Sequence, residues 1–194
     1  MPKASNPRLK PALPDFPEYY TQIAFAARRR ANCKGYKVGA VLVVDNRVVS
    51  TGYNGVPEGM TNCLDGGCDR CSNPQKYQSG VGYDVCICVH AEENALLTAA
   101  RFGIPVGGGT MYTTVKPCFS CMKALHQAGI TAVRFHKEWT HPDESLHSQY
   151  RAIEAKFSGG VKKVDTRDPD NQNWVYPKKP KVSQKPQGKN RKKR

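Results

Sequence analysis

The sequence predicts an α/β fold, a three-layer α/β/α sandwich around a mixed central sheet of about five strands. Two observations predict this fold. After an initial pair of strand-like segments, helix and strand patterns alternate along the chain, which favours a sheet with helices on its faces. Residues 11–170 are nearly neutral and long enough for one domain, because a chain of about 150 residues buries roughly 68–70% of its unfolded surface.

The first elements are a helix and a hairpin. The helix is expected to begin near Phe16, after a proline-rich stretch, and to run to the cluster Arg28–Arg30. Residues 37–44 and 47–53 are rich in β-branched side chains and flank Asp45-Asn46. Two such runs around a tight polar turn predict a β-hairpin.

The later elements follow a long loop. Apolar residues recur at helical spacing from Ala91, and Gly103 with Pro105 is expected to end that helix. The remaining expected elements are a strand at 110–115, a helix at 119–127, a strand at 130–136, a helix at 143–157 and a strand at 161–165.

Charge divides the chain into three parts. Lys and Arg number 30 against 16 Asp and Glu, but residues 1–10 and 171–194 hold basic residues and no acidic ones. We expect a disordered arm at 1–15, a folded domain at 16–167 and a basic disordered tail at 168–194. We expect no membrane span, because no apolar run is long enough, and no signal peptide, because residues 1–10 lack the apolar stretch of one. A cytoplasmic location is expected, or a nuclear one in a eukaryote, because the tail resembles basic import signals.

The segment 56–88 is an insert that lacks apolar periodicity. It is rich in Gly, Asn, Asp and Cys and is too long for an ordinary connection, so something other than a hydrophobic core must order it. The chain contains eight cysteines. In a chain without an export signal, such a number indicates metal or catalytic chemistry rather than disulfides.

Two motifs form a candidate catalytic metal site. His90-Ala91-Glu92 is followed by Pro117-Cys118 and Cys121, the H-x-E and P-C-x-x-C pattern of zinc deaminases. Cys118 and Cys121 would project to one face of a helix, and Pro117 suits the start of that helix. His90, Cys118 and Cys121 would leave a fourth tetrahedral position open, as catalytic zinc requires, with Glu92 as the catalytic proton carrier. The alternative is a pair of buried thiols beside a core histidine.

With these motifs the chain resembles the deoxycytidylate (dCMP) deaminase family of the cytidine/deoxycytidylate zinc deaminase superfamily, from Phe16 to Asp165. The insert cysteines make it most like the fungal-type members. The other matching stretches are Val38-Gly39-Ala40-Val41, Gly52-Tyr53-Asn54-Gly55-Val56-Pro57 and His90 to Ala95. The resemblance implies a cytidine deaminase-like fold and hydrolysis of dCMP to dUMP, which supplies thymidylate synthesis. It also implies a homo-oligomer, with a hexamer favoured, activated by dCTP and inhibited by dTTP.

Further site residues follow from the resemblance. Asn54, with Tyr53, would contact the nucleotide, and Arg101 would belong to the regulatory switch. Asn54 could instead serve a turn, and Arg101 could be a helix-end cation. The substrate phosphate needs a cation, for which Arg29 is a candidate, although a charge run is commonly a solvated helix face. Trp139 could close over the pyrimidine or belong to the core.

Six more cysteines form a candidate pool for a second, structural zinc: Cys33, Cys63, Cys68, Cys71, Cys86 and Cys88. Related deaminases with such inserts carry an additional zinc, and the resemblance places Cys33 and Cys63 among its ligands. A metal would order the insert, because its binding contributes folding free energy directly. Six cysteines exceed the four ligands of one ion, so two would be free or a further ion is present. Disulfides and inert thiols are the alternatives.

Two rival functions use the basic tail. One is deamination of single-stranded DNA or RNA, since Lys and Arg bind backbone phosphates whatever the sequence. The other is a zinc-stabilised nucleic-acid-binding module without catalysis. The nearly neutral folded part argues against the first rival. Glu92 and an open zinc position argue against the second. Nonspecific nucleic-acid contact through the tail is compatible with the leading prediction.

Overall fold

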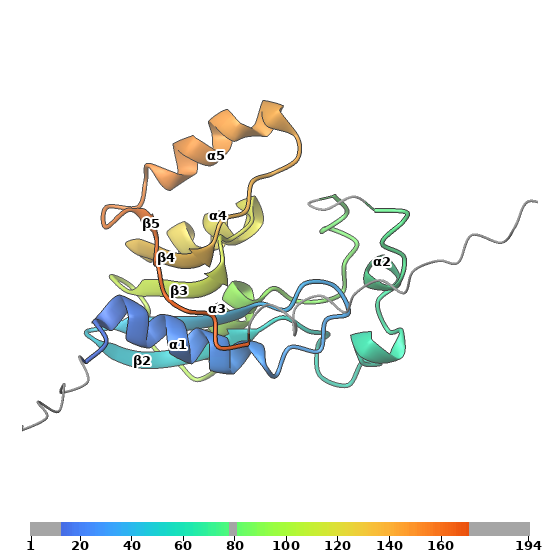
Figure 1. The fold of residues 1–194 in the computed structure, drawn as a ribbon, viewed down its shortest axis with the longest axis horizontal. Helices are drawn as coiled ribbons and strands as arrows, with labels where there is room; N and C mark the ends of the chain where they lie inside the picture. The colour runs from blue at the N-terminus through green and yellow to red at the C-terminus, as the bar shows by residue number, and fades with distance from the viewer. Residues whose placement is uncertain (1–12, 78–80, 171–194) are drawn as a thin grey trace, which may run out of the picture.

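The computed structural model describes residues 13–77 and 81–170, and it contains the expected mixed five-stranded sheet (Figure 1). The strand order is β2-β1-β3-β4-β5. β1 pairs antiparallel with both β2 and β3, whereas β3, β4 and β5 are parallel. The strands are β1 (Gly39–Val44), β2 (Arg47–Tyr53), β3 (Thr110–Val115), β4 (Ala132–Lys137) and β5 (Val161–Lys163).

Helices cover both faces of the sheet. α1 (Phe16–Arg28) packs on one face, while α3 (Ala91–Arg101) packs on the other beside α4 (Phe119–Gln127), and α5 (His147–Glu154) packs on α4. Alternation along β1 explains the arrangement, because successive side chains point to opposite faces. Val41 and Val43 pack with Tyr20 and Ala24 of α1, whereas Ala40 and Leu42 join the core that contains α3 and α4. The three-layer prediction is confirmed.

The hairpin turn uses left-handed backbone at both central residues. Asp45 has φ 47° and Asn46 has φ 57°, values that Asp and Asn tolerate better than most residues. The hydroxyl of Tyr20 donates a hydrogen bond of 2.8 Å to the carbonyl oxygen of Asn46. This hydrogen bond links the hairpin turn to α1.

Several predicted elements are shorter than expected, including the strands expected at 37–44 and 161–165, which are Gly39–Val44 and Val161–Lys163 in the structure. Two further differences have a clear cause. The expected helix at 143–157 is divided, because the carboxylate of Asp143 accepts the backbone N–H of Ser145 and forms a separate 3-10 helix, η2 (Glu144–Leu146), before α5. The expected strand at 130–136 begins at Ala132 instead. The N–H of Ile130 is bonded to the carbonyl oxygen of Leu125, so Ile130 closes the end of α4.

A buried cation anchors the end of the described chain. The guanidinium of Arg28 lies 2.6 Å from Oδ1 of Asp168 and 2.8 Å from Oδ2 of Asp170. Contacts to α1 thus continue past the expected domain end at 167. The expected arm and tail lie outside the described residues apart from 13–15 and 168–170, so the domain boundaries stay predictions.

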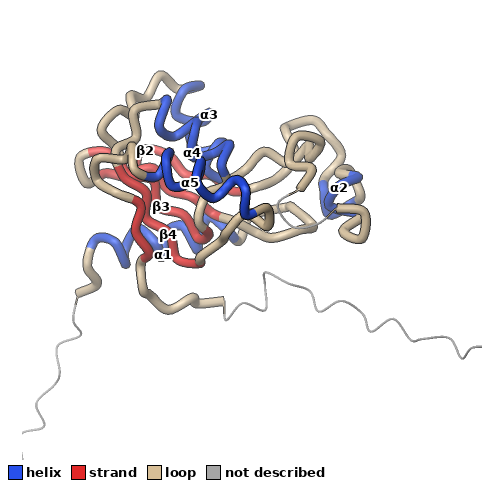
Figure 2. The backbone as a smooth tube through the Cα atoms, turned by 90° about the horizontal axis from the view of Figure 1, so that it is seen from above, coloured by secondary structure: helices blue, strands red, loops and turns tan. Residues whose placement is uncertain are grey.

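The insert lies to one side of the sandwich in both views (Figures 1 and 2). Its regular structure in the described residues is a 3-10 helix, η1 (Cys63–Asp65), and a single turn, α2 (Asp69–Ser72). Two backbone hydrogen bonds join the two ends of the insert. Gly55 donates to the carbonyl of Val89 at 3.2 Å, and Val89 donates back to Gly55 at 2.9 Å. The insert therefore leaves and re-enters the domain at one point.

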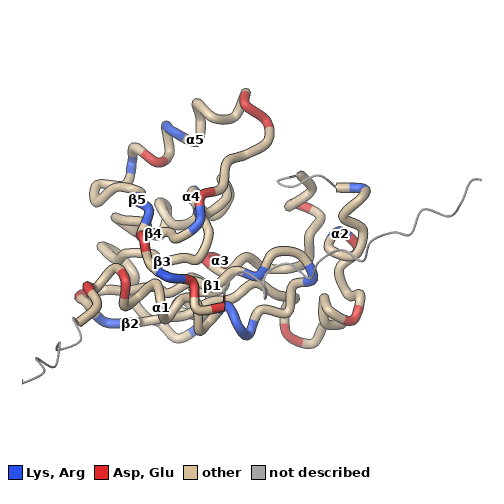
Figure 3. Tube along the Cα trace, in the orientation of Figure 1, with Lys and Arg blue, Asp and Glu red and all other residues tan. Residues whose placement is uncertain are grey.

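Acidic and basic residues are interspersed over the described part of the chain (Figure 3). The ion pairs among them include one at Lys116, whose ammonium lies 3.0 Å from Glu138 and 2.8 Å from Glu154. None of the helices in the described ranges combines the length and the apolarity that a bilayer crossing requires.

Candidate functional site

The candidate metal ligands lie at the starts of two neighbouring helices. His90 is the N-cap residue of α3, and Cys118 is the N-cap residue of α4, with Cys121 one turn further on. Neither His90 nor Cys118 uses its side chain to cap its helix. Both side chains are therefore available to a ligand, and a helix start favours the negative charge of a thiolate.

The distances among these three side chains fit a zinc ion. Nδ1 of His90 lies 3.3 Å from Sγ of Cys118 and 3.4 Å from Sγ of Cys121. Tetrahedral bonds of about 2.0–2.1 Å to nitrogen and about 2.3 Å to sulfur separate the two ligand atoms by about 3.6 Å. The donor set and its spacing are thus those of a zinc site with three protein ligands.

The electrostatics of the site favour a cation. Burial lowers the pKa of His90, but the hydrogen bond and charge of Cys118 outweigh burial and raise that pKa to about 9. Hydrogen bonding from Cys121 lowers the pKa of the Cys118 thiol to about 4. The His90 ring therefore favours its protonated form beside a Cys118 thiolate, and the thiolate is the form of cysteine that binds metal.

Glu92 is a buried carboxylate beside the ligands. Its Oε2 lies 3.7 Å from Sγ of Cys121, and its Oε1 accepts a hydrogen bond of 3.4 Å from Oγ1 of Thr113. Burial is the main cause that raises the pKa of Glu92 to about 7, against the opposing effect of His90. Such a carboxyl can accept and return a proton near neutral pH. The next residue, Glu93, is exposed, in line with its weaker candidacy.

Two residues of this site escaped the sequence predictions. Thr113 lies in β3, where nothing in its sequence context points to Glu92. Tyr83 comes from the insert, and its ring meets the His90 ring edge-on at 5.0 Å between centroids. The one sequence feature that could have indicated Tyr83 is that it is an aromatic residue in a glycine-rich stretch shortly before the H-x-E motif.

Aromatic rings continue from Tyr83 away from His90. The centroid of Trp139 lies 6.4 Å from that of Tyr83 and 6.0 Å from that of Tyr150. Trp139 is half-buried, so it belongs partly to the packing and partly to the surface beside the candidate site. A row of rings next to a catalytic group suits a planar heterocyclic substrate.

The stretch with Asn54 joins the sheet to α3. Oδ1 of Asn54 accepts the N–H of Val38 at 2.8 Å, and its Nδ2 donates to the carbonyl of Tyr36 at 2.7 Å. The carbonyl of Tyr53 accepts a hydrogen bond of 2.7 Å from Nδ2 of Asn94 in α3. These bonds give both residues a structural task, and their nucleotide role stays a prediction.

The two arginine candidates lie at helix ends. Arg29 follows α1 directly; its side chain is 51% exposed and pairs with Asp170 at 2.7 Å. Arg101 is the last residue of α3, exposed and 3.8 Å from Glu58. Eleven helical residues span about 15 Å, so the Arg101 backbone lies far from the His90 end of its helix. These contacts do not show that either arginine binds a ligand, so both roles stay predictions.

The six other cysteines are brought together at the insert. All six are free thiols, and five of them are buried, Cys86 being half-buried. They fall into two overlapping groups of four whose sulfur atoms lie close enough to bind a metal: Cys33, Cys63, Cys71 and Cys88, and Cys68, Cys71, Cys86 and Cys88. The predicted pool is therefore a spatial cluster.

Comparisons with known proteins agree on one family. The family model described as the cytidine and deoxycytidylate deaminase zinc-binding region matches residues 14–137. A deoxycytidylate deaminase of Schizosaccharomyces pombe is 42% identical over 126 residues, which cover 65% of this chain but only 38% of that protein. The deoxycytidylate deaminase of Mycobacterium phage D29 is 42% identical over 131 residues, which cover 64% of this chain and 97% of the phage protein.

A solved structure gives a similar result. The dCMP deaminase of the cyanophage S-TIM5, crystallised with dCMP and dUMP, is 26% identical, with a TM-score of 0.58. The match covers 79% of this chain and 99% of the phage chain.

Proposed function

This chain belongs to the cytidine and deoxycytidylate deaminase family, and from that membership we propose that it hydrolyses dCMP to dUMP and ammonia. The observation that carries the proposal is the position of the buried Glu92 carboxylate, 3.7 Å from one of three side chains spaced as zinc ligands. Relatives named deoxycytidylate deaminase support dCMP as the substrate. The product dUMP would supply thymidylate synthesis.

His90, Cys118 and Cys121 would hold the catalytic zinc. When bound, zinc supplies Lewis-acid activation of water at neutral pH. A structural metal at the insert cysteines is the second part of the cofactor proposal.

Glu92 is the proton carrier. Its carboxylate accepts the proton that water loses as the oxygen adds to C4 of cytosine, and it delivers that proton to the ring nitrogen N3. Glu92 then takes the remaining proton from the C4 hydroxyl and passes it to the amino group, so that C4=O forms as the C4–N bond breaks and ammonia leaves. The hydroxyl of Thr113, which lies 3.4 Å from Oε1 and 3.0 Å from the carbonyl oxygen of Val115, would help to orient the carboxylate. Burial keeps Glu92 protonatable near pH 7, as a group that must both accept and donate requires.

The remaining predicted residues, together with Tyr83, would bind the nucleotide. Tyr83 and Trp139 would flank the base, Asn54 would contact the sugar or phosphate, and Arg29 would approach the phosphate by exchanging its contact with Asp170. Regulation by dCTP and dTTP through Arg101 and assembly into a hexamer complete the proposal. Exposed Leu97 and Phe102, near Arg101 in sequence, offer apolar surface for assembly. Light scattering and kinetics with each triphosphate test both points.

The decisive experiment measures ammonia release from dCMP, deoxycytidine, CMP and a cytosine-containing single strand, beside a Glu92→Ala variant. We expect turnover of dCMP above the others and none with the variant. Turnover of the strand but not of dCMP would overturn the proposed substrate. No turnover at all with zinc bound would favour the binding module instead.

A further inference from the structure

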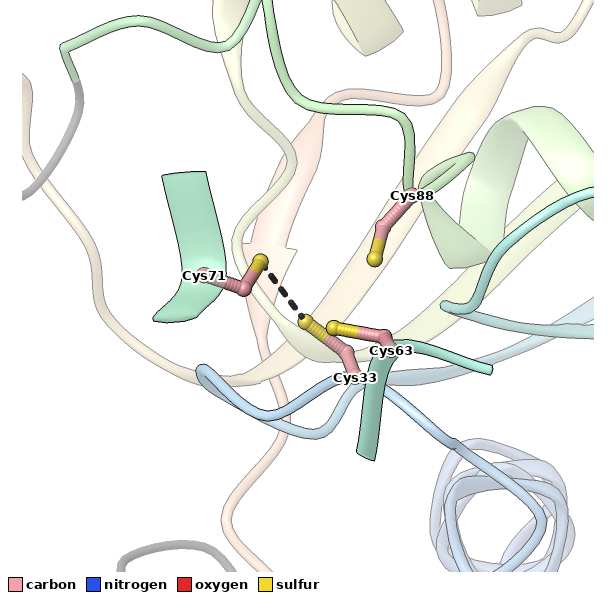
Figure 4. A group of neighbouring side chains, drawn as sticks. All are labelled: Cys33, Cys63, Cys71 and Cys88. Carbon is pink, nitrogen blue, oxygen red and sulfur yellow. Dashed lines mark hydrogen bonds between the residues drawn. The ribbon is translucent and has the colours of Figure 1, made fainter. Parts of the chain in front are cut away.

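The six cysteines at the insert do not fall into a single group of four. They form two groups of four that share Cys71 and Cys88. Within each group all sulfur atoms lie within 4.8 Å of one another. In one group, the sulfurs of Cys33, Cys63, Cys71 and Cys88 converge from four separate stretches of chain (Figure 4).

The sulfur separations match the edges of zinc tetrahedra. Sγ of Cys33 lies 3.6 Å from Sγ of Cys71 in the first group. In the second group, Sγ of Cys86 lies 3.7 Å from the sulfurs of both Cys68 and Cys71. Zinc–sulfur bonds of about 2.3 Å at tetrahedral angles separate neighbouring sulfurs by about 3.8 Å. The same spacing occurs on both sides of the shared residues.

A single ion would leave two thiols without a partner cation. If the first group held it, Cys68 and Cys86 would be spare, although they lie at tetrahedral spacing from each other. If the second group held it, the buried Cys33 and Cys63 would be spare. We therefore propose that the insert binds two zinc ions in one cluster, in which Cys71 and Cys88 bridge both ions. Cys33 and Cys63 complete one tetrahedron, and Cys68 and Cys86 complete the other.

The charge of the cluster is acceptable at a partly buried site. Two Zn²⁺ with six thiolates carry the same net charge as one Zn²⁺ with four thiolates, because two sulfurs are shared. Backbone N–H groups offset part of it. The N–H of Lys34 donates to Sγ of Cys63 at 3.2 Å, and backbone N–H groups also donate to Cys33 and Cys68.

Ligand chemistry selects the metal. A set made only of thiolates excludes the hard cations Mg²⁺ and Ca²⁺, and tetrahedral sulfur is typical of zinc. The cluster shares no ligand with His90, Cys118 and Cys121. It is therefore a separate metal site from the one proposed for deamination, and the full chain would hold three zinc ions.

Native mass spectrometry of the full chain purified with zinc tests the stoichiometry. We expect three zinc ions per chain, and two in a His90→Ala variant, which removes only the candidate catalytic site. Two ions in the wild type and one in the variant would overturn the cluster in favour of a single insert ion. Two ions in both proteins would support the cluster while contradicting the candidate catalytic site. The two failures are thus distinguishable.

Cadmium-113 NMR of the cadmium-exchanged wild-type chain tests the bridging without any substitution. Shared thiolates predict two insert resonances that are scalar-coupled to each other, in addition to one uncoupled resonance from the candidate catalytic site. Two uncoupled insert resonances would overturn the bridging, and one would overturn the second ion. Visible absorption and iron in the protein as purified would contradict the choice of zinc.

Discussion

The two cysteine sites of this chain are built in opposite ways. At the candidate catalytic site, α3 and α4 pack on the sheet through an apolar core, and their first turns bring His90, Cys118 and Cys121 together. At the insert, the regular structure of the described residues is one 3-10 turn and one α-helical turn, and the buried apolar cluster consists of the cysteines themselves. In the first region the fold positions the ligands, whereas in the second the ligands position the chain.

The largest expected effect follows from this contrast. Removing metal with a strong chelator should disorder the insert and leave the sheet folded, because structural zinc contributes of the order of 10–16 kcal/mol to small zinc domains. Limited proteolysis and hydrogen exchange should show cleavage and fast exchange within residues 56–88, and protection in β1, β3 and α3. Global unfolding on chelation would contradict the contrast between the two regions.

The next effect separates catalysis from folding. Glu92→Gln should lower kcat for dCMP by about 10²–10⁴-fold, because the amide cannot carry the proton. The thermal midpoint and the metal content should stay near the wild-type values. Glu93→Gln is the matched control, and since its side chain is exposed, it should leave kcat unchanged. Equal losses of kcat in Glu92→Gln and Glu93→Gln would contradict the proposed role of Glu92.

A third effect concerns the sheet region alone. Arg28→Met should lower the free energy of unfolding by about 3–5 kcal/mol, because it leaves two carboxylates near α1 without their buried cation. Arg29→Met, at a half-exposed pair, should cost about 0–1 kcal/mol. Denaturant titrations measure both values.

Arg29→Met also tests the proposed contact of Arg29 with the substrate phosphate. A raised KM for dCMP but not for deoxycytidine would support that contact, and unchanged KM values would contradict it.

The Arg28 ion pairs also predict a pH dependence. Burial would raise the pKa of Asp168 and Asp170, but the hydrogen bonds from Arg28 and Arg29 outweigh burial and lower both pKa values. The stability they contribute is present above the ordinary pKa of aspartate, about 3.9, and is lost as pH falls through the lowered pKa values. The difference in the free energy of unfolding between wild type and Arg28→Met should therefore become smaller below about pH 4. A constant difference down to about pH 2 would contradict this origin of the stability.

The smallest effect tests the link between the sheet and the catalytic helix. A Cβ on Gly52 would collide with the carbonyl oxygen of Ala91 and the nitrogen of Ala95 in α3. Gly52→Ala should therefore cost about 1–3 kcal/mol and shift the first turn of α3, which lowers kcat. Gly107→Ala, where a Cβ meets open space, is the control. Unchanged kcat and stability in Gly52→Ala would show that the contact relaxes without moving His90.

The sequence predicted the sheet region well because local patterns decide it. The hairpin, the helix from Ala91 and the position of Cys118 and Cys121 on one helix follow from periodicity, turn residues and spacing. The six insert cysteines were identified as a pool, but their grouping was not predictable. It depends on how loops from residue 33, residues 63–71 and residues 86–88 meet in space, and no periodicity records that.

Thr113 and Tyr83 were missed for the same reason. The contact of Thr113 with Glu92 arises from packing between β3 and α3, and the contact of Tyr83 with His90 arises from the path of the insert. The short 3-10 helix before α5 was missed because a single side chain, Asp143, decides it. Sequence patterns predicted most of the helices and strands, but they did not predict the side-chain contacts between them.

The paired hydrogen bonds between Gly55 and Val89 make the insert a candidate for transplantation. Its two ends already occupy neighbouring positions, so a short turn could replace residues 56–88 without stretching the sheet. Such a truncation would keep Cys33 but discard Tyr83, and a graft of the insert alone onto another hairpin would lack Cys33. An engineer moving this module would therefore have to carry the segment after α1 along with it.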